Sequence, residues 1–337
     1  MQAKALICDA SQQFTIEDVT LPDLRAEDIL VRTLYSGVSI GTEFALIRNK
    51  LSWGPYPLCT GYQSVGVVEQ VGDQVSGFSI GARVYLRGHH RTMQLNRTGD
   101  MVSPVSGTHC SHVLVDTTVA SHGAALLPEG VDPAVASLFV MPAVGLFGVD
   151  MANPRMGQTV VVFGVGPIGL GVVAACSHRG CRVIAVDVAA SHLEVAKKLG
   201  ADVLIDSTEG DPVAAVYDVA PEGADVVFEC TGIPACVNQT IPMCKTNGTF
   251  VMQGNYGAAP FPFDFLPAHG RKLTMYFPCD DGWAPCRRAI MRNLANGVLP
   301  WHHTITHRVE AAEAAAFYHA VNTGTAGDVL GAVIHWS

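Results

Sequence analysis

Short apolar runs alternate with segments of helical periodicity through the middle of this chain. Val160–Phe163 is a β-branched run of the length expected for a strand buried in a parallel sheet. A glycine-rich turn, an apolar helical segment and a second strand at 182–186 follow it. Further strands are expected at 203–205, 226–229, 249–253 and 273–277. This alternation is typical of a parallel sheet covered by helices.

The first 140 residues have a different pattern, in which short segments alternate polar and apolar positions. The elements predicted there are a hairpin at 4–8 and 14–19, a strand at 28–36, a helix at 44–50, a loop at 87–106, a strand at 112–115 and a helix at 132–147. After residue 277 we expect a helix at 284–296, a strand at 305–309, a helix at 311–322 and a strand at 331–336. We expect this last part to return to the β-rich region.

The composition agrees with a large folded protein and argues against several functional classes. The 337 residues are enough for two domains, with 49% hydrophobic and 15% charged residues. A net charge of −9 argues against a nucleic-acid-binding surface, and no apolar run is long enough to span a membrane. The N-terminus lacks signal-peptide features, and ten cysteines without a C-x-x-C pair suit a reducing compartment. We therefore expect a cytoplasmic protein.

The turn after the first central strand is a candidate dinucleotide site. Gly164, Gly166 and Gly169 form G-x-G-x-x-G between a strand and a helix, where glycines allow a tight turn and close approach of a pyrophosphate. Asp187 follows the next strand, about 20 residues on, where a carboxylate binds the adenosine ribose. An acid there would repel a 2′-phosphate, so NAD is favoured over NADP. The expected cofactor residues are Gly164, Gly166, Pro167, Ile168, Gly169, Asp187, Thr231, Gly232, Gly254, Asn255 and Tyr256.

Motifs along nearly the whole chain resemble one superfamily. They are Gly37…Gly41-Thr42-Glu43, Pro57-x-x-x-Gly61-Tyr62-Gln63-x-x-Gly66-x-Val68, Gly72…Val75-x-x-Phe78-x-x-Gly81-x-Arg83-Val84, Gly164-x-Gly166-Pro167-Ile168-Gly169, Phe228-Glu229-Cys230-Thr231-Gly232, Ile305-Thr306-His307-Arg308-Val309 and Gly331-Ala332-Val333-Ile334. On these motifs the sequence is similar to the medium-chain dehydrogenase/reductase superfamily of zinc-type alcohol dehydrogenases. It looks closest to the sorbitol and threonine dehydrogenase-like branch, and two segments also resemble the hydroxyethyl bacteriochlorophyllide dehydrogenase group.

The resemblance implies an α/β protein with two domains. A GroES-like β-barrel catalytic domain would span 1–141 and 277–337, and a Rossmann domain, a doubly wound parallel sheet, would span 142–276. The family implies hydride transfer between an alcohol and NAD(P) in a cleft between these domains. It also implies a homodimer, in which the strand at 273–277 joins two sheets edge to edge.

The sequence departs from this family at the zinc ligands. The cysteine of the family's turn is replaced by Ser39 or Ile40, and the histidine of its Gly-His-Glu segment by Tyr62, followed by Gln63. The third ligand position falls near 139–141, and 87–106 contains no cysteine for a structural zinc. Zinc prefers thiolate, imidazole or carboxylate ligands. We therefore expect no metal at either standard site.

Without zinc, the substrate oxygen needs a nearby proton donor or acceptor. Tyr62 could supply a phenol to the substrate, or it could be a wall residue with a structural hydrogen bond. Glu43 could be a base, a substrate contact, or an acid that stabilises a helix N-terminus. His89 could be an acid/base, since histidine titrates near neutrality, or a loop residue. Ser39 and Gln63 are further candidates as substrate contacts or as supports for the other residues.

These observations predict a zinc-independent, NAD-dependent oxidoreductase. Its substrate would be a secondary alcohol related to polyols, sugars or cyclitols, which exchanges hydride with the nicotinamide. An NAD(P)H-dependent quinone or enoyl reductase is an alternative, because zinc-free members of the family often reduce activated double bonds. A non-catalytic dinucleotide-binding protein is another, because the usual zinc ligands are missing.

Overall fold

The computed structural model describes residues 1–48 and 54–336. Contacts within the chain divide it into two compact units, Met1–Val140 with Ile305–Ser337, and Met141–Thr304. Each unit has its own sheets and hydrophobic core. Over the described segments, no helix has the length and apolar character needed to cross a membrane.

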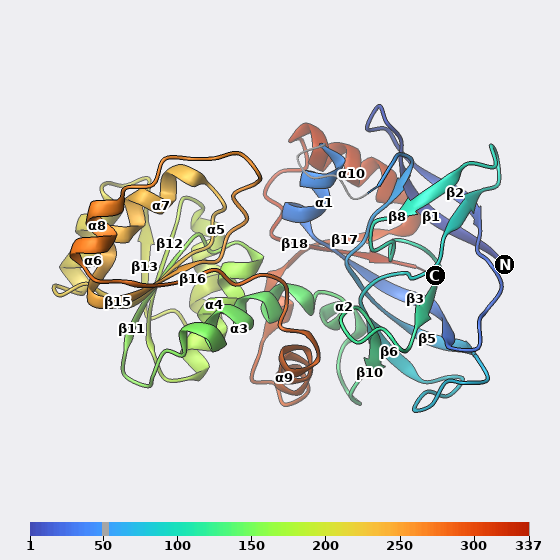
Figure 1. Cartoon of the computed structure of the whole chain (residues 1–337), viewed down its shortest axis with the longest axis horizontal. Helices are drawn as coiled ribbons and strands as arrows, with labels where there is room; N and C mark the ends of the chain where they lie inside the picture. Colours follow the sequence, from blue (N-terminus) through green and yellow to red (C-terminus); the bar gives the residue numbers. More distant parts are fainter. Residues whose placement is uncertain (49–53, 337) are drawn as a thin grey trace. The chain divides into compact units, whose positions relative to one another are not determined.

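The first unit contains a small closed barrel and a larger, mostly antiparallel sheet. The barrel has the order β1-β2-β7-β8-β4, and the sheet has the order β10-β6-β5-β3-β18-β17, with β9 also paired to β3. The strands are β1 Gln2–Cys8, β2 Phe14–Thr20, β3 Asp28–Val38, β4 Leu58–Cys59, β5 Gln63–Val71, β6 Arg83–Leu86, β7 Met93–Leu95, β8 Met101–Pro104, β9 His112–Asp116, β10 Ala124–Leu126, β17 Ile305–Glu310 and β18 Gly331–His335. Figure 1 shows the C-terminal strands (red) beside β3 (blue), so the two ends of the chain build one sheet.

The predicted N-terminal hairpin is confirmed, and a local side chain shapes its turn. Strands β1 and β2 pair antiparallel, from Cys8 opposite Phe14 to Gln2 opposite Thr20. In the turn, the Asp9 carboxylate accepts hydrogen bonds from the backbone N–H groups of Ser11 and Gln13. Such local acceptance by aspartate favours a turn over a continued strand.

Helices α1 (Ile40–Ile47), α2 (Pro133–Ala136) and α10 (Ala314–Thr323) complete the first unit. Phe44 of α1 stacks on Tyr318 of α10, with ring centroids 5.3 Å apart, in the core that also contains β18. The Asp132 carboxylate caps α2 by accepting from Ala134 N–H at 2.8 Å. Helices α1 and α10 therefore bury apolar faces against β1, β3 and β18 in one core.

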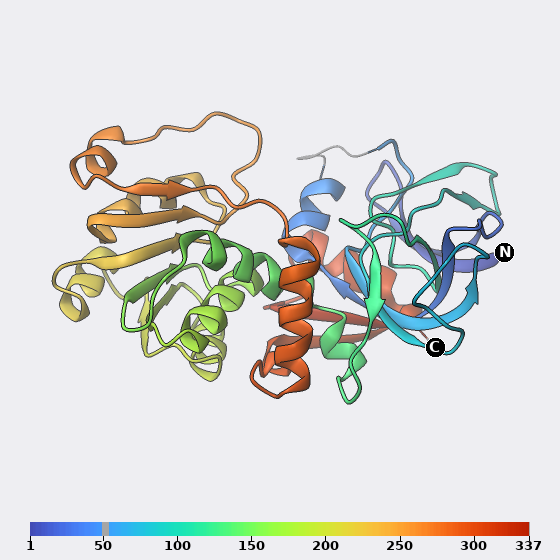
Figure 2. The ribbon, with the colours of Figure 1, turned by 60° about the horizontal axis from the view of Figure 1, so that its bottom comes forward.

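The second unit is a six-stranded parallel sheet with helices, as the alternating pattern predicted. Its order is β13-β12-β11-β14-β15-β16. The strands are β11 Thr159–Phe163, β12 Arg182–Asp187, β13 Val203–Asp206, β14 Ala224–Glu229, β15 Cys244–Met252 and β16 Thr274–Tyr276; the helices are α3 Val140–Ala152, α4 Pro167–His178, α5 Ala190–Lys198, α6 Pro212–Val219, α7 Pro234–Thr240, α8 Phe265–Gly270 and α9 Trp283–Ala295. Figure 2 shows that β15 is followed by a long loop (orange), which leads to α8.

The helix expected at 132–147 is two helices in the structure. Helix α2 ends at Ala136, and α3 begins at Val140. Pro142 explains the break, because it lacks the N–H that an uninterrupted helix would need, and its ring would clash with the carbonyl of Leu138. The Ser137 hydroxyl donates to the carbonyl of Ala134 at 2.8 Å and so bonds to the end of the first helix.

Two other local expectations need correction. The segment 87–106 is not only a loop, because it contains β7 and β8, which pair with each other and with strands of the barrel. These strands are three and four residues long, too short for a periodic pattern to reveal. The helix expected at Phe44–Lys50 begins earlier, at Ile40, and ends at Ile47; Lys50 lies outside the described residues.

The expected domain boundary at 277 also differs from the structure, in which 277–304 belongs to the second unit. Helix α9 explains this assignment, because it packs against α3 of the same unit. The Cys286 thiol of α9 lies 3.7 Å from a carboxylate oxygen of Asp150 in α3. At the start of α9, a Cβ on Gly282 would meet the ring of Phe147, also in α3, at 2.9 Å.

Candidate functional site

The turn between β11 and α4 contains three glycines. Two of them have no room for a side chain, and the third faces open space. Gly164 has φ +88°, and a Cβ on it would lie 2.7 Å from the Thr231 methyl group. A Cβ on Gly169 would lie 2.0 Å from the carbonyl oxygen of Gly164. Gly166 has no such neighbour within 4 Å, and α4 begins directly after it. The open side of Gly166 therefore meets a helix N-terminus, which attracts phosphate groups.

Asp187 ends β12 beside this turn, and backbone groups fix its carboxylate. One carboxylate oxygen accepts from Val165 N–H at 2.6 Å, and the other accepts from Ala189 N–H at 2.9 Å. Asp187 also lines a cavity of about 470 Å³. Other residues that line it are Gly164, Gly166, Val188, His192, Thr231 and Ile233. The cavity has the size and position expected of an adenosine site at the carboxyl edge of the sheet.

The loops after β14 and β15 form the rest of this edge, and Glu229 holds them together. Its carboxylate accepts hydrogen bonds from the backbone and hydroxyl groups of Thr231 and from the hydroxyl of Tyr256. Burial raises the pKa of Glu229 despite these bonds. The Tyr256 hydroxyl is therefore engaged with Glu229. In the sequence, Glu229 was evident only as part of a motif, and these contacts were not predicted.

The same two loops approach each other closely at their glycines. A Cβ on Gly254 would lie 2.4 Å from the backbone nitrogen of Gly232, and a Cβ on Gly232 would lie 2.7 Å from the carbonyl of Asn255. A side chain at either glycine would therefore clash with the backbone of the other loop. The expected cofactor residues of the second unit thus gather at the carboxyl edge of one sheet.

In the first unit, the segment that carries Tyr62 is held from both sides. His109 N–H donates to the carbonyl of Thr60 at 3.1 Å, and Thr108 N–H donates to the carbonyl of Gly61 at 3.1 Å. The Thr108 hydroxyl donates to the carbonyl of Gln63 at 3.2 Å. These bonds fix the backbone around Tyr62, whose side chain is largely buried.

Arg87 lies against Tyr62, which the sequence analysis did not anticipate. Its guanidinium carbon is 5.0 Å from the centroid of the Tyr62 ring, within cation–π distance. Arg87 directly follows β6 and is buried. The contact therefore places a buried positive charge against the Tyr62 ring. The signal in the sequence was a basic residue directly after β6, which pairs with β5, the strand that begins directly after Tyr62.

Glu43 belongs to a fully buried network that joins distant parts of the first unit. One carboxylate oxygen accepts from Ser39 N–H at 2.8 Å. The other accepts from the Tyr318 hydroxyl at 2.7 Å and lies 3.0 Å from His109 Nε2. His109 Nδ1 lies 2.8 Å from the Ser36 hydroxyl, which also accepts from the indole N–H of Trp336.

The contacts of this network lower the pKa of the Glu43 carboxyl group. Burial alone would raise its pKa, but His109, the Ser39 N–H and Tyr318 together lower the pKa below its ordinary value. Burial and the neighbouring carboxylate raise the pKa of Tyr318 well above its usual range. An ionised carboxylate with its acceptor positions engaged is a positioning group, so the structure favours the structural alternative for Glu43.

Gln63, Ser39 and His89 also have structural contacts. The Gln63 side-chain oxygen accepts from Val140 N–H at 2.6 Å, and the Ser39 N–H donates to Glu43. His89 Nδ1 accepts from Leu114 N–H at 2.9 Å, and burial lowers the pKa of His89 to about 3. The expectation that His89 titrates near neutrality therefore conflicts with the structure, because desolvation disfavours its charged form.

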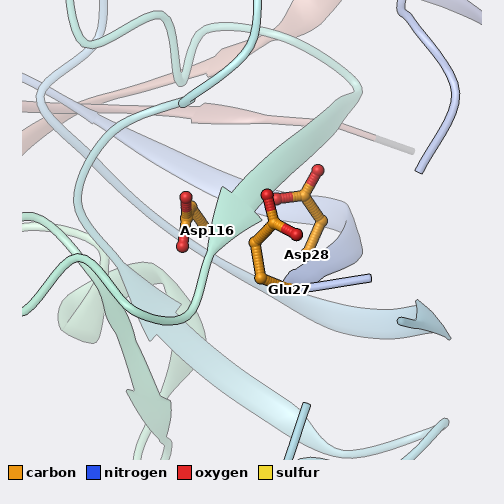
Figure 3. A group of neighbouring side chains, drawn as sticks. All are labelled: Glu27, Asp28 and Asp116. Atoms are coloured by element: carbon orange, nitrogen blue, oxygen red, sulfur yellow. The ribbon is translucent and has the colours of Figure 1, made fainter. Parts of the chain in front are cut away.

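One acidic cluster, Glu27, Asp28 and Asp116, brings three carboxylates within metal-ligand distance of one another (Figure 3). Arg91 is among them: its guanidinium pairs with Asp28 and lies 3.1 Å from Glu27 and 3.2 Å from Asp116. These ion pairs join the start of β3 to the end of β9. The positive charge of Arg91 offsets the repulsion among the three carboxylates, so their proximity needs no metal ion.

Comparison with known proteins places the chain in a family. A model described as "Alcohol dehydrogenase GroES-like domain" matches residues 25–127, and one described as "Zinc-binding dehydrogenase" matches 167–292. The chain belongs to the zinc-type alcohol dehydrogenase superfamily. Its two matched domains correspond to the two units of the structure, and the expected fold of a GroES-like domain with a Rossmann-like parallel sheet is confirmed.

Individual relatives cover nearly the whole chain. Erythritol/L-threitol dehydrogenase of Mycolicibacterium smegmatis is 26% identical and aligns with 92% of this chain and 91% of its own length. L-threonine 3-dehydrogenase of Aeromonas hydrophila is 26% identical and aligns with 93% of this chain and 94% of its own length. The structure of benzyl alcohol dehydrogenase from Acinetobacter calcoaceticus superposes with a TM-score of 0.87 over 100% of both chains, at 18% identity. The last likeness is one of fold.

The superfamily's zinc-ligand positions carry other side chains in this chain. Tyr62 and Gln63 replace the usual histidine and glutamate, and the Gln63 oxygen is already bonded to Val140. Within residues 1–48 and 54–336, no group of three His, Cys, Asp or Glu side chains gathers at ligand distance apart from the Arg91-paired acids. Four-coordinate zinc needs three or four such ligands.

Proposed function

We propose that this protein is an NAD-dependent oxidoreductase that transfers hydride between a secondary alcohol and the nicotinamide. The dinucleotide turn carries the proposal: Gly166 leaves space at a helix N-terminus, and Asp187 stands beside it with its carboxylate fixed by two backbone N–H groups. Two relatives are named for erythritol and threitol, and for threonine, all of which bear secondary hydroxyl groups. A polyol, sugar or cyclitol-like alcohol is the substrate class we infer.

We assign the proton transfer to Tyr62. Oxidation of an alcohol to a ketone sends a hydride to the nicotinamide and leaves the hydroxyl proton for a base. Tyr62 stands at the position of a zinc ligand in the superfamily, and the Arg87 guanidinium beside its ring favours the phenolate that accepts this proton. In the reverse direction the phenol returns the proton to the ketone oxygen. The bonds to Thr60, Gly61 and Gln63 keep this segment in place.

The cofactor preference provides a direct test at Asp187. The wild-type protein should bind NADH at least tenfold more tightly than NADPH, because the carboxylate can accept from a ribose diol and repels a 2′-phosphate. Asp187→Asn keeps a side-chain acceptor for Val165 or Ala189 but removes the charge, and it should narrow the ratio of the two dissociation constants several-fold. Fluorescence titration with each nucleotide measures this ratio.

Asp206→Asn is the matched control, since this acid ends the neighbouring strand β13 and bonds within its own turn to Thr208. It should leave the ratio of the two dissociation constants unchanged. An unchanged ratio in Asp187→Asn, or tighter binding of NADPH by the wild-type protein, contradicts the assignment of NAD.

We also propose that the chain forms a homodimer through β16. This strand is the last in the order of the parallel sheet, and Phe277 directly after it is 65% exposed. An edge strand flanked by apolar residues is buried when it pairs with a second copy. Light scattering at micromolar concentration should give twice the mass of the 35.7 kDa chain.

A further inference from the structure

His109 belongs both to the buried network around Glu43 and to the backbone that holds Tyr62. It is fully buried and lies just before β9. Its N–H donates to the carbonyl of Thr60 at 3.1 Å, and its carbonyl accepts from the N–H of Leu6 at 2.9 Å. The backbone of His109 therefore connects β1 with the segment that carries Tyr62.

The His109 ring packs directly against Gly61, the residue before Tyr62. Gly61 has φ +111°, and a Cβ on it would lie 2.4 Å from the His109 backbone nitrogen and 2.9 Å from Cγ of the ring. No side chain at Gly61 separates the ring from this backbone. Because protein interiors are close-packed, a shift of the ring would displace Gly61 and the residue that follows it.

Three hydrogen-bonding groups, each from a different element, fix the orientation of the His109 ring. Nδ1 lies 2.8 Å from the Ser36 hydroxyl of β3. Nε2 lies 2.6 Å from the Tyr318 hydroxyl of α10 and 3.0 Å from the Glu43 carboxylate of α1. Both ring nitrogens are thus engaged in a buried site. A buried network whose members are bonded holds one arrangement, so the ring cannot rotate without breaking these contacts.

We propose that His109 is a positioning residue for the proton transfer of Tyr62. Its ring, held by the buried network, fixes Gly61 and so determines where the phenol meets the substrate hydroxyl. The inference rests on the proposed function, in which Tyr62 accepts the proton. A displacement of about 1 Å in such a site can lower the rate about 10²-fold. This effect acts only through the phenol, whereas an effect on stability alone would not depend on it.

A double-mutant cycle separates the two effects. Asparagine is shorter than histidine, so His109→Asn keeps a polar group beside Ser36 but loses the contacts of Nε2. It should lower kcat for alcohol oxidation at least tenfold in otherwise wild-type protein. In the Tyr62→Phe background the same substitution should change kcat less than twofold, because no phenol is left to misplace. The dissociation constant of NADH should stay within twofold throughout.

Tyr318→Phe is a milder second variant, because it removes only the hydroxyl near Nε2 and keeps the ring that stacks on Phe44. It should lower kcat by a smaller factor, again only where Tyr62 is present. Circular dichroism of each variant checks that it is folded.

His112→Asn is the matched control, because this half-buried histidine contacts Ser111 and Glu69 rather than the buried network. Its kcat should stay near that of the wild-type protein. A folded His109→Asn protein with wild-type kcat, or equal losses of kcat in both backgrounds, overturns the role of His109. Wild-type kcat in Tyr62→Phe alone would refute proton transfer by Tyr62 itself, and the role of His109 with it, so the single and double variants distinguish the two failures.

Discussion

Tyr62→Phe should reduce kcat by a factor of about 10²–10⁴, which is the usual contribution of a positioned acid/base. The substitution removes only the phenolic oxygen, so the ring remains available to Arg87. The dissociation constant of NADH should stay within twofold of the wild-type value, because the expected adenosine and pyrophosphate contacts lie in the second unit. Steady-state kinetics with an alcohol and NAD, together with NADH titration, measure both quantities.

Tyr217→Phe is the matched control for this variant. It also removes a hydroxyl, one that donates to the carbonyl of Pro242 at 2.7 Å in the second unit, away from the glycine turn. Its kcat should stay near that of the wild-type protein. If Tyr62→Phe retains more than a tenth of the wild-type kcat, the phenol does not carry the proton, and the proposed mechanism is wrong.

Substitution of Arg87 tests this mechanism through the pH dependence of kcat. If the guanidinium favours the Tyr62 phenolate, Arg87→Gln should move the rise of alcohol oxidation with pH to higher pH. A role for Arg87 that is only structural would lower the rate or the stability without moving the pH profile. The pH dependence of kcat for the wild-type protein and the variant distinguishes these two roles.

Glu43→Ala should reduce the free energy of unfolding by about 3–5 kcal/mol, because each buried donor left without an acceptor costs about 1–3 kcal/mol. It leaves the Ser39 N–H and the Tyr318 hydroxyl without their acceptor and His109 Nε2 without its neighbour, all in a fully buried site. Urea denaturation followed by tryptophan fluorescence measures the change, and Trp336 reports on the same network through Ser36.

Glu310→Ala is the control, because it removes an exposed carboxylate 2.9 Å from His335 Nδ1 in the same unit. An exposed pair of this kind contributes at most about 1 kcal/mol. A loss below 1 kcal/mol for Glu43→Ala as well would mean that the network does not stabilise the unit.

The pH dependence of the unfolding free energy shows whether ionised Glu43 stabilises the folded protein. The pKa of Glu43 is lower in the folded protein than its ordinary value of 4.5. The unfolded chain therefore binds the proton more readily, and the stabilisation is complete above pH 4.5 and lost as the pH falls through the folded value. The difference in unfolding free energy between the wild-type protein and Glu43→Gln should be constant above pH 5 and shrink at lower pH.

Local patterns were sufficient to predict the second unit. β-branched runs such as Val160–Phe163 indicate buried parallel strands, and the spacing of Gly164, Gly166 and Gly169 between a strand and a helix indicates the turn. The break at Pro142 and the short strands β7 and β8 were missed. A three-residue strand has too few positions to display a period, and the proline was outweighed by the apolar residues around it.

The site of the first unit was only partly predictable, because its contacts join residues far apart in sequence. Glu43 and Tyr318 are 275 positions apart, and His109 and Tyr318 are 209 apart. No periodicity connects such residues, so Glu43 could not be recognised as a network member. Arg87 was missed for the same reason, since its contact with Tyr62 depends on the pairing of β5 with β6.

The most direct test of the central claim is NAD-dependent turnover of a panel of secondary alcohols by protein whose zinc content has been measured by elemental mass spectrometry. We expect NADH formation with at least one polyol, sugar or cyclitol by protein that holds far less than one zinc per chain. Activity that appears only when about one zinc is bound per chain would contradict the metal-free mechanism. Tight binding of NADH without turnover of any alcohol would contradict the proposed dehydrogenase function.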